Sequence, residues 1–119
     1  MSCATFVSYS FAVRTAAHLA HLTAKTYAHH MALGDFYDTL TELTDKYAEV
    51  CMGLEGKQPV FPGVKALDYD NPVELVEDYL EYVQSESKDA ARGSQALLNI
   101  LAELEELSAQ TVYKLKFLK

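Results

Sequence analysis

The sequence predicts an all-α protein, a four-helix bundle in which one long crossover joins the second and third helices. Apolar residues recur at three- and four-residue steps along most of the chain, and no strand pattern interrupts them. Three of the five glycines and all three prolines fall in residues 53–72, which therefore form the crossover. The length of 119 residues fits one domain, residues 1–119.

The first two helices occupy the chain up to about Met52. Residues from about Thr5 to Met31 contain neither Gly nor Pro and keep helical spacing. An unbroken helix from Thr5 to Met52 would be about 70 Å long, too long for a globule of this size. The chain must therefore bend between Leu22 and Asp35. The bend falls either at residues 23–26 or at Gly34, where Asp35 would cap the second helix.

The third and fourth helices follow the crossover. Asn71 is the expected N-cap of the third helix and Pro72 its first residue, and this helix should end near Ser87. The fourth should run from about Asp89 close to the C-terminus. The expected buried stripes of the second, third and fourth helices are Phe36, Leu40, Leu43, Tyr47 and Val50, then Val73, Val76, Tyr79, Leu80 and Val83, then Leu97, Leu101, Leu104, Ser108, Thr111, Leu115 and Leu118.

Composition excludes several classes of protein. A net charge of -7 and a pI near 4.9 disfavour a nucleic-acid partner, which requires a basic surface. No apolar run reaches the roughly 20 residues that span a bilayer, so no membrane association is expected. Cys3 and Cys51 lie far apart without metal-ligand spacing. We interpret them as buried thiols of a cytoplasmic protein in a reducing compartment, not as a disulfide.

Histidines and carboxylates are the candidate functional residues. His18, His21, His29 and His30 are the four histidines of the chain, and they lie within thirteen residues. A row of acids follows on the second helix: Asp38, Glu42, Asp45 and Glu49. This row is either a solvated face or part of a cation site. Imidazole with carboxylate suits iron, zinc or manganese, whereas half-buried packing residues are the alternative interpretation of the histidines.

The spacing of four of these residues resembles a known family. His18, His30 twelve residues later, Asp45 fifteen further on and Glu49 four beyond that are similar to the ferroxidase motif of the Dps proteins, small ferritin-like iron-storage proteins. This resemblance implies a ferritin-like bundle. It also implies an iron site shared between subunits, with the two histidines from one subunit and the Asp and Glu from its neighbour, where ferrous iron is oxidised.

A second resemblance favours a different histidine. The segment from His21 to His30 is similar to small helical proteins of tailed bacteriophages, which favours His21 over His18 and implies the host cytoplasm as the location. The chain departs from Dps in lacking Trp and a Lys-rich N-terminal tail. In addition, an unbroken helix through His30 would turn His18 and His30 about 120° apart and place His18 and His29 on one face.

Two functions follow as hypotheses. The first is a ferritin-like metal-binding protein with His18, His30, Asp45, Glu49 and also His21 as candidate ligands. The second is a non-catalytic helical protein that blocks a host protein or sequesters a small ligand. Both predict a homo-oligomer, at least a dimer. This predicted oligomer rests on the small-residue patch from Ala16 to Ala20 and on five tyrosines expected at the surface. The tyrosines are Tyr9, Tyr27, Tyr37, Tyr79 and Tyr82.

Overall fold

Four helices form the protein in the computed structural model, which describes residues 2–119. They are α1 (Cys3–Leu22), α2 (Tyr27–Glu55), α3 (Pro72–Ala91) and α4 (Gln95–Phe117), and the described residues contain no strand. The predicted all-α four-helix bundle is therefore confirmed. None of the helices in residues 2–119 is both long and apolar enough to span a membrane.

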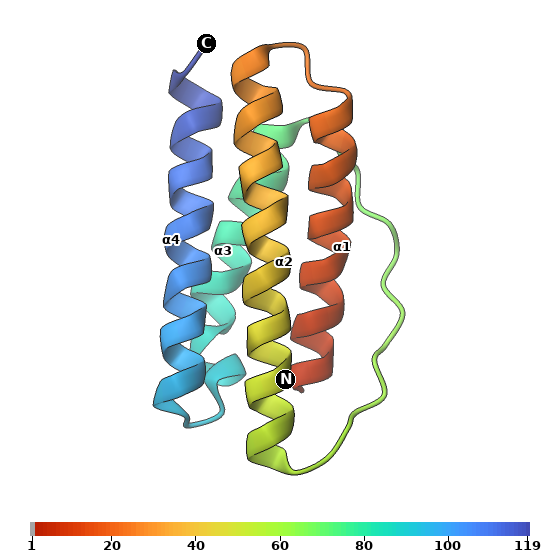
Figure 1. Cartoon of the computed structure of the whole chain (residues 1–119), viewed down its shortest axis with the longest axis vertical. Helices are drawn as coiled ribbons and strands as arrows, with labels where there is room; N and C mark the ends of the chain where they lie inside the picture. The colour runs from red at the N-terminus through yellow and green to blue at the C-terminus, as the bar shows by residue number, and fades with distance from the viewer. Residues whose placement is uncertain (1) are drawn as a thin grey trace.

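The helices form two antiparallel hairpins joined by one crossover (Figure 1). α1 packs against α2 and α3 against α4, and the hairpins meet chiefly through α2 and α4. Residues 56–71 return along the outside of α1, so that α2 and α3 point the same way. This is the predicted single long crossover, a connection that ferritin-like bundles also use. A shared connection defines topology and not function.

The turn between α1 and α2 falls at residues 23–26, one of the two predicted positions. Thr23 ends α1 by donating its hydroxyl to the carbonyl of Leu19 at 2.9 Å. Thr26 begins α2, because its Oγ1 accepts the backbone N–H of His29 at 3.1 Å. The alternative prediction, a break at Gly34 with Asp35 as a cap, is wrong because both residues lie inside α2.

Local capping also sets the ends of α3 and α4. Asn71 accepts the backbone N–H of Glu74 at 3.1 Å and Pro72 is the first helical residue, as predicted. The other boundaries were predicted several residues too early, because α3 continues to Ala91 and α4 begins only at Gln95. Arg92 and Gly93 have positive φ and make the turn, and Ser94 then caps α4 by accepting the N–H of Leu97.

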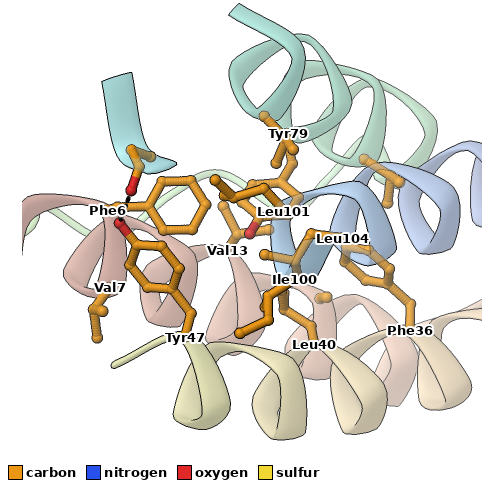
Figure 2. Packing of buried hydrophobic residues seen from close by; sticks show 14 of the residues in the cluster. Phe6, Val7, Val13, Phe36, Leu40, Tyr47, Tyr79, Ile100, Leu101 and Leu104 are labelled. Atoms are coloured by element: carbon orange, nitrogen blue, oxygen red, sulfur yellow. Dashed lines mark hydrogen bonds between the residues drawn. The ribbon is translucent and has the colours of Figure 1, made fainter. Parts of the chain in front are cut away.

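The predicted stripes converge on one core (Figure 2). Phe36, Leu40 and Tyr47 of α2 pack against α1, α3 and α4 and are fully buried. Leu118, which lies just beyond α4, is exposed instead. Two buried hydroxyls keep partners, since Tyr47 donates to the carbonyl of Ala90 at 2.7 Å and Tyr79 pairs with Ser10 at 2.8 Å. Because these polar groups are satisfied, their burial carries little desolvation penalty.

Several residues expected at an oligomer surface lie in this core. Tyr79 is completely buried, which confirms its place in the predicted stripe of the third helix and shows that its second assignment, to the surface, is wrong. Tyr9, Tyr37 and Tyr82 pack partly buried against the core, and of the five tyrosines only Tyr27 is largely exposed, at 78%. The residues Ala16, Ala17 and Ala20 are buried within the chain. This patch therefore brings helices of one subunit together and gives no support to a dimer.

The two cysteines are bonded to each other. Cys3 in the first turn of α1 and Cys51 near the end of α2 form a disulfide with their Cα atoms 6.6 Å apart. Both residues are buried, as predicted, but the interpretation as separate thiols is wrong. The antiparallel hairpin is the physical reason, because it carries the start of α1 to the last turns of α2 despite 48 residues of intervening chain.

Buried tyrosines make the bundle sensitive to alkali. Burial raises the pKa of Tyr47 from 10.0 to about 12, and it also raises the pKa of Tyr9, Tyr79 and Tyr82. Above pH 10 the unfolded chain binds fewer protons than the folded one, so the free energy of unfolding should fall as the pH rises through about 12. Urea unfolding at a series of alkaline pH values measures this loss. Tyr47→Phe should make this loss of stability smaller. A free energy of unfolding that stays constant across these pH values would contradict the raised pKa of the buried tyrosines.

Candidate functional site

The histidines gather around the turn of the first hairpin. α1 supplies His18 and His21 from its last two turns, and α2 supplies His29 and His30 from its first. Because the chain breaks at residues 23–26, the geometry of an unbroken helix does not apply. His21 and His30 face each other across the hairpin.

His21 and His30 hold each other in a reciprocal arrangement. Their rings stack with centroids 3.8 Å apart. Nδ1 of His21 lies 2.6 Å from the carbonyl oxygen of His30, and Nδ1 of His30 lies 3.0 Å from the carbonyl oxygen of His21. The His21 carbonyl lies in the last turn of α1, where C=O groups need partners outside the helix, whereas the His30 carbonyl lies in the first turn of α2 and accepts the imidazole of His21 as an additional donor. Each side chain therefore closes the turn against the other helix.

These two bonds determine where each ring carries its proton. A carbonyl oxygen can only accept, so Nδ1 is the donor in both rings. In the neutral imidazole Nε2 then keeps its lone pair. Metal-bound histidines have this arrangement, in which one ring nitrogen donates to a carbonyl while the other binds the ion. Both rings are only half-buried, and their reciprocal bonds use Nδ1, so Nε2 is the nitrogen of each ring that could bind a ligand.

His18 joins the same group through an aromatic neighbour. Its ring stacks on Tyr37 at 4.1 Å with planes 13° apart, and it lies 6.1 Å from the ring of His21. His18, His21, His30 and Tyr37 form what we call the imidazole cluster. Arg14 lies beside it, with its guanidinium 5.4 Å from the centre of the Tyr37 ring. Arg14 also donates to the Thr41 hydroxyl at 3.1 Å, which fixes its position.

Gly34 makes room for the imidazole cluster. A Cβ at this position would lie 3.0 Å from Cε1 and 3.1 Å from Nδ1 of His21, whereas a Cβ at Gly53 of the same helix would meet nothing within 4 Å. Gly→Ala in a helix normally adds about 1 kcal/mol of stability. We expect Gly53→Ala to show this gain and Gly34→Ala to lose it, because the His21 ring must move away from its bond to His30. Thermal unfolding of both variants measures the difference, and equal gains would contradict this packing.

His29 has a different role. Its Nε2 donates to the carbonyl oxygen of Leu115 at 2.8 Å, near the end of α4. The ring thus ties the start of α2 to the second hairpin and does not join the imidazole cluster. It is a packing histidine, which was the alternative interpretation for all four.

Asp45 and Glu49 lie far along α2 from the imidazole cluster. Asp45 is fifteen residues after His30 on one helix, a separation of about 22 Å. All four predicted acids, Asp38, Glu42, Asp45 and Glu49, are exposed. In residues 2–119, three or more potential ligand atoms lie within 4.8 Å of one another only at Cys3, Cys51 and Glu55, so the three histidines of the imidazole cluster do not form such a group within one chain. One chain therefore does not assemble His18, His30, Asp45 and Glu49 into a site.

The fold and these contacts define a class, a single-crossover four-helix bundle with an imidazole cluster at its first hairpin. The chain belongs to DUF5856, a family of unknown function whose profile matches residues 21–115. The matched range includes His21, His30, Asp45 and Glu49, whereas His18 and Cys3 precede it. No curated protein and no solved structure matches the chain.

Three features of this region were not predicted from the sequence. Tyr37 and Arg14 were not considered as neighbours of the histidines, and Gly34 was considered only as a helix break. Helical spacing places Gly34 and Tyr37 one and two turns after His30, on its side of α2. That spacing would have indicated that both face α1 once the turn at residues 23–26 was chosen.

Proposed function

We propose that this protein binds a transition metal ion at a site shared between two copies of the chain. The favoured ion is ferrous iron. His18 and His30, with His21 as a further ligand, would come from one subunit, and Asp45 and Glu49 from the other. The observation that carries this proposal is the reciprocal bonding of His21 and His30, which leaves Nε2 of each ring as a lone-pair donor.

The position of the acids favours two copies over one. Asp45 lies about 60° and Glu49 about 100° around α2 from His30, so the three residues lie on adjoining sides of the helix. If two α2 helices crossed antiparallel near Asp38, His30 of each copy would approach Asp45 and Glu49 of the other. The carboxylates are exposed, and no ion pair within the described residues 2–119 neutralises Asp45 or Glu49.

The donor set favours iron, with zinc and manganese as alternatives. Two or three imidazoles with two carboxylates suit these ions better than soft ions such as Cu⁺, which select thiolate and thioether ligands. Four or five protein ligands leave at least one position of a six-coordinate ion open, where an oxidant such as dioxygen could take one electron from each ferrous ion. Binding is the core of the proposal, and oxidation is its extension. We further propose that this protein acts in the cytoplasm, where cellular thiol reductants would open the Cys3–Cys51 bond.

Paired acidic variants test the site. Asp45→Asn with Glu49→Gln should weaken ferrous binding, measured by anaerobic calorimetry, by at least about tenfold. The matched control, Asp78→Asn with Glu81→Gln on α3, removes the same charge from exposed positions outside the proposed α2 crossing and should leave affinity unchanged. Equal losses in both variants would show general attraction to an acidic surface. Titration under air, followed by absorbance, tests the oxidation separately, and a monomeric mass in solution would contradict a shared site.

A second candidate function is protein binding, as in the phage-type hypothesis of a helical factor that blocks a host protein. Exposed apolar side chains favour it where the start of α2 meets the end of α4: Tyr27, Met31, Tyr113, Phe117 and Leu118. Tyr113 and Phe117 contact each other with ring centroids 5.7 Å apart. If this function is correct, Tyr113→Ser with Phe117→Ser should abolish capture of a host protein, whereas His30→Ala with Asp45→Ala should leave it intact.

A further inference from the structure

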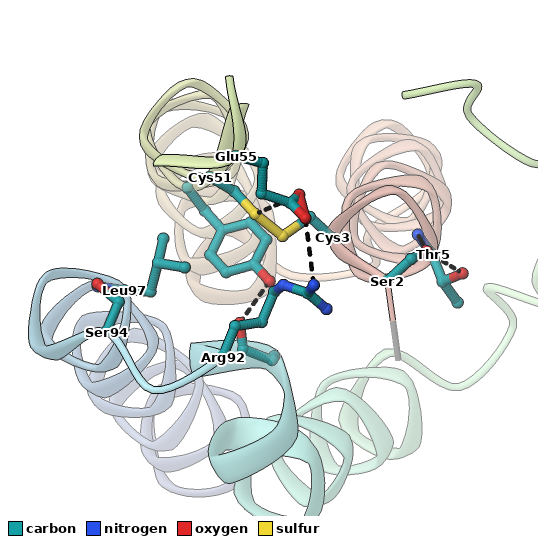
Figure 3. The surroundings of a disulfide bond; sticks show 10 residues. Ser2, Cys3, Thr5, Cys51, Glu55, Arg92, Ser94 and Leu97 are labelled. Carbon is teal, nitrogen blue, oxygen red and sulfur yellow. Dashed lines mark hydrogen bonds and ion pairs between the residues drawn. A yellow bond between two sulfur atoms is a disulfide. The ribbon is translucent and has the colours of Figure 1, made fainter. Parts of the chain in front are cut away.

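The disulfide end of the bundle holds a second group of potential metal ligands (Figure 3), and the imidazole cluster lies at the opposite end of α1 and α2. Sγ of Cys3, Sγ of Cys51 and a carboxylate oxygen of Glu55 all lie within 4.8 Å of one another. Cys51 and Glu55 are one turn apart on α2, and Oε1 of Glu55 lies 3.4 Å from Sγ of Cys51. No other group of three such side chains occurs in the part of the chain that the structure describes.

We propose that reduction of the Cys3–Cys51 bond converts this group into a binding site for a thiophilic divalent cation such as Zn²⁺. Two thiolates and one carboxylate would bind the ion, and water would complete a tetrahedron, which is the ligand number of an open zinc site. This inference is independent of the proposed iron site. It concerns other residues, another ligand type and the opposite end of α1 and α2.

The surroundings suit anionic sulfur. Cys3 is the first residue of α1, where the helix dipole favours negative charge. Both cysteines are almost fully buried, at 4% and 1% exposure, so a bound ion would be shielded, while Glu55 at the surface gives access from solvent. The Cα separation of 6.6 Å is near the upper end for a disulfide, so the sulfur atoms can move apart by side-chain rotation.

Arg92 competes for the same carboxylate. Its Nη2 lies 3.2 Å from Oε2 of Glu55, and both side chains are partly exposed. The other oxygen, Oε1, is the one beside Cys51. A cation bound to the two sulfur atoms would therefore be coordinated by Oε1 of Glu55, while the Arg92 guanidinium remains paired with Oε2. Removing the guanidinium should strengthen cation binding.

The redox step is a two-electron exchange. A dithiol reductant transfers two electrons and two protons to the Cys3–Cys51 bond, so that two thiols form and the reductant becomes a disulfide. Binding of Zn²⁺ then releases both thiol protons. In the reverse direction a small disulfide takes up two electrons from the zinc-bound thiolates and two protons from water. The Cys3–Cys51 bond re-forms and Zn²⁺ leaves.

Cobalt and zinc titrations test the site in the full-length chain. A His30→Ala, Asp45→Asn background removes one imidazole and one carboxylate of the proposed iron site, so a failure of one site cannot be mistaken for a failure of the other. After reduction with a phosphine, which becomes the phosphine oxide, Co²⁺ should give a thiolate charge-transfer band that saturates at one ion per chain. The disulfide form should give none. Absence of the band from the reduced protein would overturn the proposal.

Substitutions separate ligands from bystanders. Glu55→Gln should weaken Zn²⁺ binding by at least about tenfold, and Arg92→Asn, which keeps a residue that tolerates positive φ, should strengthen it. Glu81→Gln, an exposed glutamate on α3, should change nothing. If the reduced chain loses helical circular dichroism, Zn²⁺ should restore it, and failure to do so would also overturn the proposal. Unchanged affinity in Glu55→Gln would exclude the carboxylate.

Discussion

Replacing both Cys3 and Cys51 with Ala is expected to lower the free energy of unfolding by about 4 kcal/mol. The bond joins residues 48 apart, so its removal frees a long loop in the unfolded chain. The chain-entropy relation gives this magnitude for a loop of that size. The folded hairpin should change little, because α1 and α2 also contact each other along their length.

Urea unfolding of this variant beside the oxidised protein measures the effect. The reduced wild-type chain, with zinc removed by a chelator, is the control, since it lacks the bond but keeps the sulfur atoms. Both should unfold at similarly reduced urea concentrations. Equal stability of the oxidised and cysteine-free proteins would contradict a disulfide in solution.

Leu101→Ala should destabilise the bundle by about 3 kcal/mol. Leu101 is fully buried on α4, where its side chain reaches the shared core in Figure 2, and truncation leaves a cavity that the helices cannot fill. Leu98→Ala is the matched control, because Leu98 lies one turn earlier on the same helix and is 41% exposed. Its truncation should cost less than about 1 kcal/mol.

Thermal and urea unfolding of the two variants provide the comparison. Leu and Ala have similar helix propensities, so the difference reports burial and not helix formation. A similar loss in both variants would mean that α4 does not present Leu101 to the core.

Helical periodicity was sufficient to predict which faces form the core. The stripe through Phe36, Leu40 and Tyr47 is buried as expected, and the Asn71–Pro72 pair marks the start of α3. Both predictions use local rules, because a 3.6-residue period and a capping side chain act within one or two turns. Local rules do not determine which of two competing breaks the chain uses. Thr26 supplies a cap, whereas Gly34 is kept helical and close to the His21 ring.

Contacts between distant parts of the chain were the main failure of prediction. Tyr79 was assigned both to the buried stripe of the third helix and to the surface; it lies in the core, where its hydroxyl pairs with Ser10 on α1. Cys3 and Cys51 meet only because of the lengths of α1 and α2 and the position of the turn between them. The spacing of residues in the sequence did not determine the position of that turn. Likewise, the reciprocal bonds between His21 and His30 require the turn at residues 23–26. The candidate ligand types were visible in the sequence, but their grouping was not.

Mixing two complementary variants tests the shared metal site most directly. One variant carries His18→Ala, His21→Ala and His30→Ala, and the other carries Asp45→Asn and Glu49→Gln. Neither alone should bind ferrous iron tightly. After subunits are exchanged in equal amounts, each mixed pair regains one complete site, so bound iron should rise to about a quarter of the wild-type value. Binding that stays at the level of the separate variants, with mixed oligomers present by mass, would contradict a site built from two copies.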